Sequence, residues 1–363
     1  MHHRFNLLTL LLLGALIVGA CAGPNATQET PAATDPEAET EDSADETSAD
    51  DAGEGSLVIY SGRSETLVAP IIEQFANATG IEVEVRYGST SEMAAILLEE
   101  GENSPADIFW AQDPGGLGAV ADAGLFSTLP DNLLSRVDPR FASPEGLWVG
   151  ISGRARVIVY NTEMLSTDDL PDDIVAFTDP EWAGRIGFAP SNGSFQTMVT
   201  GMREAWGEDA TRDWLAGIAA NGPSLYENNT ATVTAVGAGE VEVGFVNHYY
   251  LYRFLAEEGE SYPARNFYLN DGGPASLVMV AGAGQLASSQ NPENAERFLD
   301  FLLSTVAQQY FASQTYEYPL VEGVVTSSLL TPLSELNTPD IALGDLADLQ
   351  GTVELLQEVG LLP

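Results

Sequence analysis

The sequence predicts an α/β fold, because short apolar runs alternate with segments of helical spacing along most of the chain. Residues 57–60 and 106–110 are apolar runs of strand length, and residues 81–87 alternate apolar and polar side chains with a period of two. The stretches between them, 67–75 and 91–100, carry apolar residues at helical spacing. Strands that alternate with helices in this way are typical of a parallel sheet in an α/β domain.

The second half of the chain repeats this alternation, which agrees with two α/β lobes and a cleft between them. Further strands are expected at 147–151, 156–160, 185–188, 241–246 and 277–281. Further helices are expected at 117–123, 195–206, 210–220, 231–238, 249–258 and, as a pair, 292–311. The segment after residue 326 is expected to be rich in helix. Periodicity alone does not fix a function for such a chain.

Length and charge exclude several classes of function. The 363 residues suffice for about two domains, and 44% are hydrophobic, which is enough for a core. The chain carries 54 acidic residues against 13 basic ones, all of them Arg, for a net charge of −41. So acidic a chain is a poor candidate for binding nucleic acid or an anionic lipid surface, since both need Lys and Arg. A single Cys excludes a disulfide framework and a Cys-rich metal site.

The N-terminus has the pattern of a bacterial lipoprotein signal. Residues 5–20 form an uncharged, Leu-rich run that is too short to span a membrane and has the length of a signal peptide core. The run ends in Val18-Gly19-Ala20-Cys21, which resembles a lipobox. We therefore expect residues 1–20 to be a signal peptide and Cys21 to be lipidated. The alternative is an ordinary signal peptide, with Cys21 there by chance.

An acidic tether is expected to follow, over residues 21–55. Residues 24–55 contain eleven acids and no base, together with Ala, Thr, Ser, Pro and Gly. Such a segment buries too little apolar surface to offset the entropy of ordering, so it should be disordered and extended by self-repulsion. A signal, a lipid and a tether together predict an extracytoplasmic domain anchored to the cell membrane, on the periplasmic or outer face.

Five stretches resemble the bacterial ferric-ion-binding proteins. They are 58–65 (VIYSGRSE), 104–110 (SPADIFW), 152–161 (SGRARVIVYN), 239–250 (GEVEVGFVNHYY) and 315–320 (TYEYPL). The Asn-x-Tyr-Tyr element after a Gly-Glu strand is the most specific of them. The resemblance implies a two-lobed type II periplasmic-binding-protein fold, with two hinge strands and a ligand cleft between the lobes. It implies lobe 1 at 56–155 plus 280–325, lobe 2 at 156–279, and a C-terminal segment, 326–363, that packs on the lobes.

In that family a pair of tyrosines binds Fe(III) as phenolates, which implicates Tyr249 and Tyr250. Ferric iron is a hard acid, and a bound metal deprotonates a protic ligand such as a phenol, whose own pKa is near 10. The alternative is that Tyr249 and Tyr250 continue into an aromatic helix face with Tyr252 and Phe254, and that this face lies in the core.

Three positions depart from the family pattern. Ser64 stands where the family members with the fullest ligand set have a His, and Gln112, followed by Asp113, stands where they have a Glu. Ser194 stands where other members have a further Tyr. We therefore expect Ser64, Gln112 and Asp113 to lie beside the iron rather than bind it. Exogenous oxygen from carbonate, phosphate, citrate or water would then complete the iron shell.

The sequence also contains groups that could hold a synergistic anion. Asn192, Gly193 and Ser194 precede a predicted helix, whose N-terminus favours anions, although plain helix capping is an alternative use of this loop. The resemblance adds four residues to this set: Asn229, Asn247, Arg63 and Arg154. Strand alternation puts Arg154 and Arg156 on one face, and the sequence leaves open which of them faces the cleft. His248 is expected to be a bystander rather than a ligand.

The resemblance implies an extracytoplasmic solute-binding lipoprotein of an ABC importer. It would capture ferric iron with carbonate or phosphate by hinge closure and dock, as a monomer, on permease and ATPase subunits. The alternatives are an importer component that binds an organophosphate or a sugar phosphate, and a purely structural surface lipoprotein. An enzyme is not expected, since the sequence has no Gly-x-Ser-x-Gly elbow, P-loop or His-Glu-x-x-His motif.

Overall fold

The computed structural model describes residues 55–363, and these residues form the predicted α/β fold. The described part contains ten strands: β1 (Ser56–Ser61), β2 (Glu82–Tyr87), β3 (Ile108–Ala111), β4 (Val149–Asn161), β5 (Ile186–Phe188), β6 (Ser224–Leu225), β7 (Val243–Asn247), β8 (Ala264–Phe267), β9 (Val278–Gln285) and β10 (Tyr318–Pro319). Its α-helices are α1 (Glu65–Thr79), α2 (Thr90–Glu100), α3 (Pro114–Asp122), α4 (Asp131–Leu134), α5 (Gly193–Trp206), α6 (Glu208–Ala220), α7 (Asn229–Gly237), α8 (Tyr249–Glu258), α9 (Pro292–Leu302), α10 (Thr305–Tyr310) and α11 (Leu349–Glu358).

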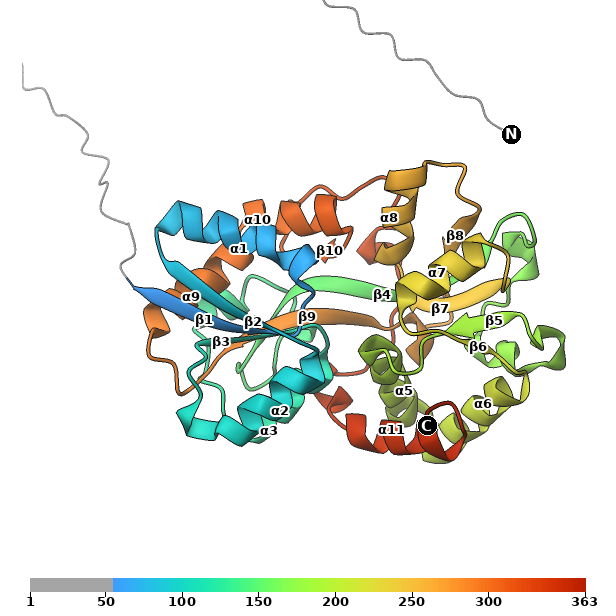
Figure 1. Ribbon diagram of the computed structural model, residues 1–363, viewed down its shortest axis with the longest axis horizontal. Coiled ribbons are helices and arrows are strands. Elements are labelled where there is room, and N and C mark those ends of the chain that lie inside the picture. Colours follow the sequence, from blue (N-terminus) through green and yellow to red (C-terminus); the bar gives the residue numbers. More distant parts are fainter. Residues whose placement is uncertain (1–54) are drawn as a thin grey trace, which may run out of the picture. The chain divides into compact units, whose positions relative to one another are not determined.

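Two lobes share the central strands β4 and β9. The strand order is β2-β1-β3-β9-β4-β7-β5-β6, while β8 and β10 each pair with β4. On one side β1, β2 and β3 run parallel, with helices α1, α9 and α10 on one face and α2 and α3 on the other (Figure 1). On the other side β5, β6 and β7 run parallel among α5 to α8 (Figure 1). We call these sides lobe 1 and lobe 2. The lobe boundaries given above stay a prediction.

Strand β4 connects the two lobes and corrects one expectation. Two strands were expected, at 147–151 and 156–160, but a single strand of 13 buried residues runs from Val149 to Asn161. It pairs with β9 and β10 on the lobe 1 side and with β7 and β8 on the lobe 2 side. The polar Ser-Gly-Arg centre of β4 interrupts the apolar pattern, yet it is buried, and Arg154 finds partners in both lobes.

The C-terminal segment contains less helix than expected. Beyond residue 326 the described structure has two short 3-10 turns, Leu333–Glu335 and Leu343–Leu346, and one α-helix, α11. Proline at positions 332 and 339 limits helix in the preceding stretch. Helix α11 lies against α5, where the hydroxyls of Thr200 and Thr352 are 2.8 Å apart.

The predicted signal peptide, Cys21 and all but the last residue of the tether lie outside the described residues. Within residues 55–363, no helix is both long and apolar enough to cross a membrane.

Candidate functional site

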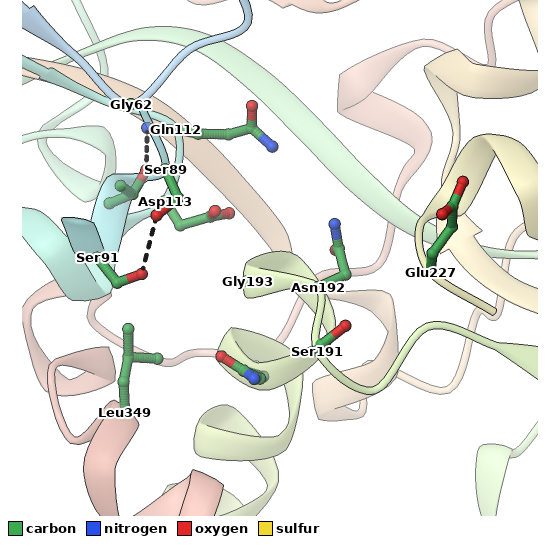
Figure 2. Close-up of a pocket in the computed structure, with 12 residues that line it drawn as sticks. Gly62, Ser89, Ser91, Gln112, Asp113, Ser191, Asn192, Gly193, Glu227 and Leu349 are labelled. Atoms are coloured by element: carbon green, nitrogen blue, oxygen red, sulfur yellow. Dashed lines mark hydrogen bonds between the residues drawn. The ribbon is translucent and has the colours of Figure 1, made fainter. Parts of the chain in front are cut away.

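A polar cleft of about 270 Å³ lies between the two lobes. Lobe 1 lines it with Gly62, residues 89–91, Gln112 and Asp113, and lobe 2 lines it with residues 191–193, Gln196 and Glu227. Leu349 of α11 closes one side. Figure 2 shows Gln112 and Asp113 on one side of this space, with Asn192 and Ser191 facing them from the other. The predicted residues Gln112, Asp113, Asn192 and Gly193 therefore meet in the cleft.

The local structure explains why these side chains meet. Asp113 follows strand β3, and Pro114 begins helix α3 directly after it. Asn192 is the N-cap of α5, and its side-chain oxygen accepts a hydrogen bond from the Ser194 amide at 3.1 Å. Each of these two turns places a helix N-terminus at the cleft, so both sides of the cleft favour negative charge.

Tyr249 and Tyr250 begin helix α8, and their rings stack with centroids 4.3 Å apart. Tyr249 is fully buried, and its hydroxyl has no hydrogen-bond partner. Burial raises its pKa well above the ordinary value for tyrosine, and the neighbouring Tyr250 adds to the rise. Tyr250 is half-buried and borders a separate cavity of about 230 Å³ between α7 and α8, with Arg253 and Phe254. Neither tyrosine is among the described residues that line the 270 Å³ cleft.

The other two aromatic residues of α8 differ in burial. Tyr252 is buried and donates to the Leu329 carbonyl at 2.9 Å, whereas Phe254 is half-buried and stacks on Tyr262 at 5.0 Å. Tyr252 thus lies in the core, and Phe254 packs against it. Tyr249 differs from Tyr252 because its hydroxyl is buried without any partner.

Arg154 joins the two lobes through a buried network of hydrogen bonds. Its Nη2 donates to the Oδ1 atom of Asp113 at 2.9 Å and also to the carbonyl oxygens of Gln112 and Val280. Its Nη1 donates to the Ser194 Oγ atom at 3.1 Å. Ser194 Oγ in turn donates to Asp113 Oδ1 at 3.0 Å, so the three side chains contact one another.

Arg156, two residues further along β4, lacks this complement of partners. Its Nη1 donates to Asn247 Oδ1 at 3.0 Å, while Nε and Nη2 are buried without a partner. Burial lowers the pKa of Arg156 to about 9, although Asp113 acts in the opposite direction. Asn247 continues the network by donating from Nδ2 to Ser194 Oγ at 3.0 Å.

Asn229 is another predicted anion contact, and it begins helix α7. It is fully buried, and its Nδ2 donates to Asn192 Oδ1 at 3.4 Å. Its own Oδ1 has no partner. The structure thus brings Asn192, Ser194, Asn229 and Asn247 together around the α5 N-terminus.

Arg63 is buried close to the tyrosines but is already paired. Its Nη1 and Nη2 donate to the two oxygens of Glu317 at 2.8 and 2.7 Å. Burial alone would lower the pKa of Arg63, but the Glu317 carboxylate raises it. An anion at Arg63 would therefore share this guanidinium with Glu317. Ser64, the next residue, is exposed, and its hydroxyl is 3.0 Å from that of Thr66.

Glu317 is a functional candidate that sequence reasoning missed. It is fully buried, and besides Arg63 it accepts from Thr315 Oγ1 at 3.0 Å. Burial alone would raise its pKa, but Arg63 outweighs that effect and lowers it. The available signal was an acid inside the otherwise uncharged stretch 315–320, since a buried carboxylate needs a cation.

His248 separates β7 from Tyr249, and both of its ring nitrogens bond to the main chain while the ring stacks on Tyr318. Its Nδ1 accepts from the Ala155 amide at 3.1 Å, so Nε2 carries the proton and donates to the Tyr316 carbonyl at 2.8 Å. Burial lowers the pKa of His248 to about 4. Both ring nitrogens are thus engaged, and the bystander role of His248 stays a prediction. Among residues 55–363, His, Cys, Asp and Glu side chains do not gather in threes around a possible metal position.

Two α/β lobes that share two central strands, with a polar cleft between them, define a two-lobed binding protein of the type II periplasmic fold. The comparisons with known proteins agree with this class. Residues 103–339 match the family described as bacterial extracellular solute-binding protein, and the chain belongs to that family.

Curated and solved relatives cover most of the chain. The chain is 34% identical to an Fe(3+)-binding periplasmic protein of Serratia marcescens over 308 residues, which is 84% of this chain and 90% of that protein. It is similar to iron-bound HitA from Pseudomonas aeruginosa, with a TM-score of 0.80, 35% identity and coverage of 84% and 99% of the two chains. It is also similar to the Trichodesmium protein IdiA (FutA) in complex with iron and citrate, with a TM-score of 0.75, 28% identity and coverage of 84% and 99%.

Proposed function

We propose that this protein captures ferric iron together with an exogenous anion and delivers it to the permease and ATPase subunits of an ABC importer. The observation that carries the proposal is the Tyr249 hydroxyl, which is buried without a partner beside the stacked ring of Tyr250. A buried polar group without a partner costs free energy, so it is retained where a ligand satisfies it. The relatives named for ferric iron support the choice of ligand.

Tyrosine suits ferric iron because iron itself removes the phenolic proton. The raised pKa of Tyr249 keeps the hydroxyl protonated in the iron-free protein. A highly charged cation reverses that preference, as metals do for other protic ligands. In this proposal Tyr249 and Tyr250 are the protein ligands, and Gln112 and Asp113 lie next to the iron.

The buried charges favour a doubly charged anion. Around the site, the buried Arg63, Arg154 and Arg156 carry three positive charges, and the buried Asp113 and Glu317 carry two negative ones, which leaves one positive charge. Asp107 is also buried, but it bonds to Ser289 and to neighbouring main-chain amides instead. Ferric iron with two phenolates adds another. A dianion such as carbonate or hydrogen phosphate would cancel both, whereas two uncompensated charges in a buried site are costly. Citrate accompanies iron in the Trichodesmium relative, and it is a further candidate here.

The site residues divide between the lobes, so ligand capture would be coupled to closure. Asp113 and Gln112 come from lobe 1, and Tyr249, Ser194 and their neighbours come from lobe 2. Arg154 and Arg156 lie on β4, which both lobes share, and Arg63 lies between β1 and α1. A ligand that contacts both sides stabilises the closed arrangement.

We further propose that Cys21 anchors the protein to the membrane by a lipid, as a monomer, after removal of residues 1–20. The sequence Val18-Gly19-Ala20-Cys21 and the acidic segment behind it support this. Replacement of Cys21 by Ser should release the protein from membranes on cell fractionation. A Cys21→Ser variant that stays in the membrane fraction would contradict the lipid anchor.

The test of iron capture is a visible absorption band. Purified protein mixed with ferric salt and bicarbonate should develop a phenolate-to-iron charge-transfer band, and the Tyr249→Phe variant should lose it. Tyr252→Phe is the matched control, because it removes a hydroxyl from the same helix that already has a protein partner. A band that survives in Tyr249→Phe, or no band with carbonate, phosphate or citrate, would refute the proposal.

A second candidate ligand is an organophosphate or a sugar phosphate. Ser64 and Gln112 in place of the family's His and Glu, together with the buried Arg and Asn network, favour it. Thermal shift separates the two, since a ligand that binds the folded state raises Tm. A sugar phosphate that raises Tm while ferric salt leaves it unchanged would replace iron as the ligand.

A further inference from the structure

Asp113 occupies the place expected for the exogenous anion. One oxygen, Oδ1, accepts from Arg154 Nη2 at 2.9 Å and from Ser194 Oγ at 3.0 Å. Arg154 and Ser194 are two of the residues predicted to hold carbonate or phosphate, and both are fully buried. Asp113 comes from lobe 1, whereas Ser194 lies at the N-terminus of α5 in lobe 2. A carboxylate of lobe 1 thus accepts from the Ser194 hydroxyl of lobe 2 and from Arg154 of the shared strand β4.

The surroundings of Asp113 fit this role. Asp113 is the N-cap residue of α3, yet its side chain makes no capping hydrogen bond to its own helix and is turned toward α5 instead. The other carboxylate oxygen, Oδ2, approaches Gly193 so closely that a β-carbon there would lie 3.0 Å from it. Only 4% of Asp113 is exposed. The first turn of α5 is therefore shaped to receive this carboxylate.

We infer that Asp113 is an internal anion that competes with exogenous carbonate or phosphate for Arg154 and Ser194. In the iron-free protein its carboxylate compensates Arg154 and holds the two lobes in contact. An exogenous anion must displace it before it can use the same donors. This inference rests on the proposed anion site. It adds one step to ligand binding, because the Asp113 carboxylate must leave Arg154 and Ser194 before the exogenous anion can bind them.

The chemistry of the donors makes displacement feasible. Arg156 lies two residues from Arg154 and has two buried nitrogens without partners, so an incoming anion gains donors that Asp113 does not use. Charge-assisted hydrogen bonds to such groups are stronger than neutral ones. A dianion that contacts both arginines can therefore accept more charge-assisted hydrogen bonds than the single carboxylate that it replaces.

The experiment measures inorganic phosphate binding to the full-length, iron-free protein by isothermal titration calorimetry. The Asp113→Asn variant removes the competing charge and keeps the shape of the side chain. We expect it to bind phosphate about tenfold tighter than the unaltered protein, a change that is well resolved by calorimetry. Asp209→Asn is the control, since it removes one negative charge from an exposed side chain outside the cleft. It should change phosphate affinity by less than about twofold.

A second variant tests the inference if Asp113→Asn does not fold. Gly193→Ala keeps every charge and moves the Asp113 carboxylate, because the new methyl group would lie 3.0 Å from Oδ2. It should also tighten phosphate binding. Equal or weaker phosphate binding in Asp113→Asn, or in Gly193→Ala where the first variant does not fold, overturns the inference.

A parallel titration with ferric salt keeps the two proposals apart. Tighter phosphate binding in Asp113→Asn with no charge-transfer band in any variant supports the internal anion and refutes iron capture. A band in the unaltered protein with unchanged phosphate affinity in Asp113→Asn supports iron capture and overturns the internal anion.

Discussion

The buried tyrosines on and near helix α8 fall into two groups. In one group the hydroxyls have hydrogen-bond partners in the protein, and in the other the hydroxyl has none. Tyr252 and Tyr318 donate to the carbonyls of Leu329 and Thr331, and both approach the Tyr268 hydroxyl, at 3.5 and 3.3 Å. Tyr249 is as deeply buried as any of them, but its hydroxyl has no partner. These tyrosines are equally buried, but only some of their hydroxyls have hydrogen-bond partners. The partnered hydroxyls stabilise the fold, and the unpartnered hydroxyl of Tyr249 is available to a ligand.

The largest expected difference between the two groups concerns iron affinity. Tyr249→Phe removes a proposed ligand, so it should cost more than the roughly 10–100-fold that loss of an outer partner of a metal ligand costs. Because the lost hydroxyl has no protein partner, the free energy of unfolding of the iron-free protein should not fall. Competition with a ferric chelator measures the affinity, and urea unfolding measures the stability. A Tyr249→Phe variant that is destabilised and keeps its iron would place Tyr249 with the structural group.

The Glu317→Gln variant tests how much the buried pair of Arg63 and Glu317 stabilises the fold. Glu317→Gln leaves the Arg63 guanidinium buried without its carboxylate, and breaking such a pair typically costs about 3–5 kcal/mol. We expect a loss of that size in urea unfolding. Exposed pairs such as Arg212 with Asp209 provide the control, since Asp209→Asn should change stability by about 1 kcal/mol or less. If Glu317→Gln lowered the free energy of unfolding by only about 1 kcal/mol, the account of a buried Arg63–Glu317 ion pair would be contradicted.

Most of the longer elements could be predicted from the sequence, but the buried polar network could not. The longer strands and helices follow from apolar periodicity, which is a local property, and the predicted helix at 249–258 coincides with α8. The short elements α4, β6, β8 and β10 were missed, because two to four residues show too little periodicity. Strand β4 was split in the prediction because residues 152–155, Ser-Gly-Arg-Ala, interrupt the apolar pattern. The Arg63–Glu317 pair joins residues 254 positions apart, and nothing local in the sequence specifies such a partner.

The same limit applies to the candidate site. The position of Tyr249 came from a resemblance, and those of Asn192 and Ser194 came from a predicted helix N-terminus. The structure places the latter two in one network. The contact of Asp113 with Ser194 depends on how the lobes close, which periodicity does not encode. The unpartnered hydroxyl of Tyr249 is likewise visible only once every neighbour is placed.

The His248 ring contacts both tyrosine groups, through Tyr249 and Tyr318. Its burial makes the free energy of unfolding depend on pH. Its pKa is lowered to about 4 in the folded protein, against about 6.5 unfolded, so the unfolded chain binds the extra proton first. The contribution of His248 is therefore fully present above pH 6.5 and falls as pH drops toward 4, by about 3 kcal/mol over that range. His248→Asn should have a shallower decline in its free energy of unfolding between these pH values. An identical decline in both proteins would contradict the buried neutral imidazole.

The smallest expected effect belongs to the structural tyrosines. Tyr318→Phe removes one hydrogen bond to the Thr331 carbonyl, which should lower the free energy of unfolding by about 1 kcal/mol. The chelator competition used for Tyr249→Phe should give an unchanged iron affinity. A loss of iron binding in Tyr318→Phe would remove the distinction between the two groups.

The most direct test of the central claim is an anomalous difference map at the iron edge, from crystals grown with ferric salt and bicarbonate. We predict a single strong peak within bonding distance of the Tyr249 and Tyr250 hydroxyl oxygens, with anion density that contacts Arg154 or Arg156. A peak bound to other side chains, or no peak at all while the cleft is closed, would contradict the account.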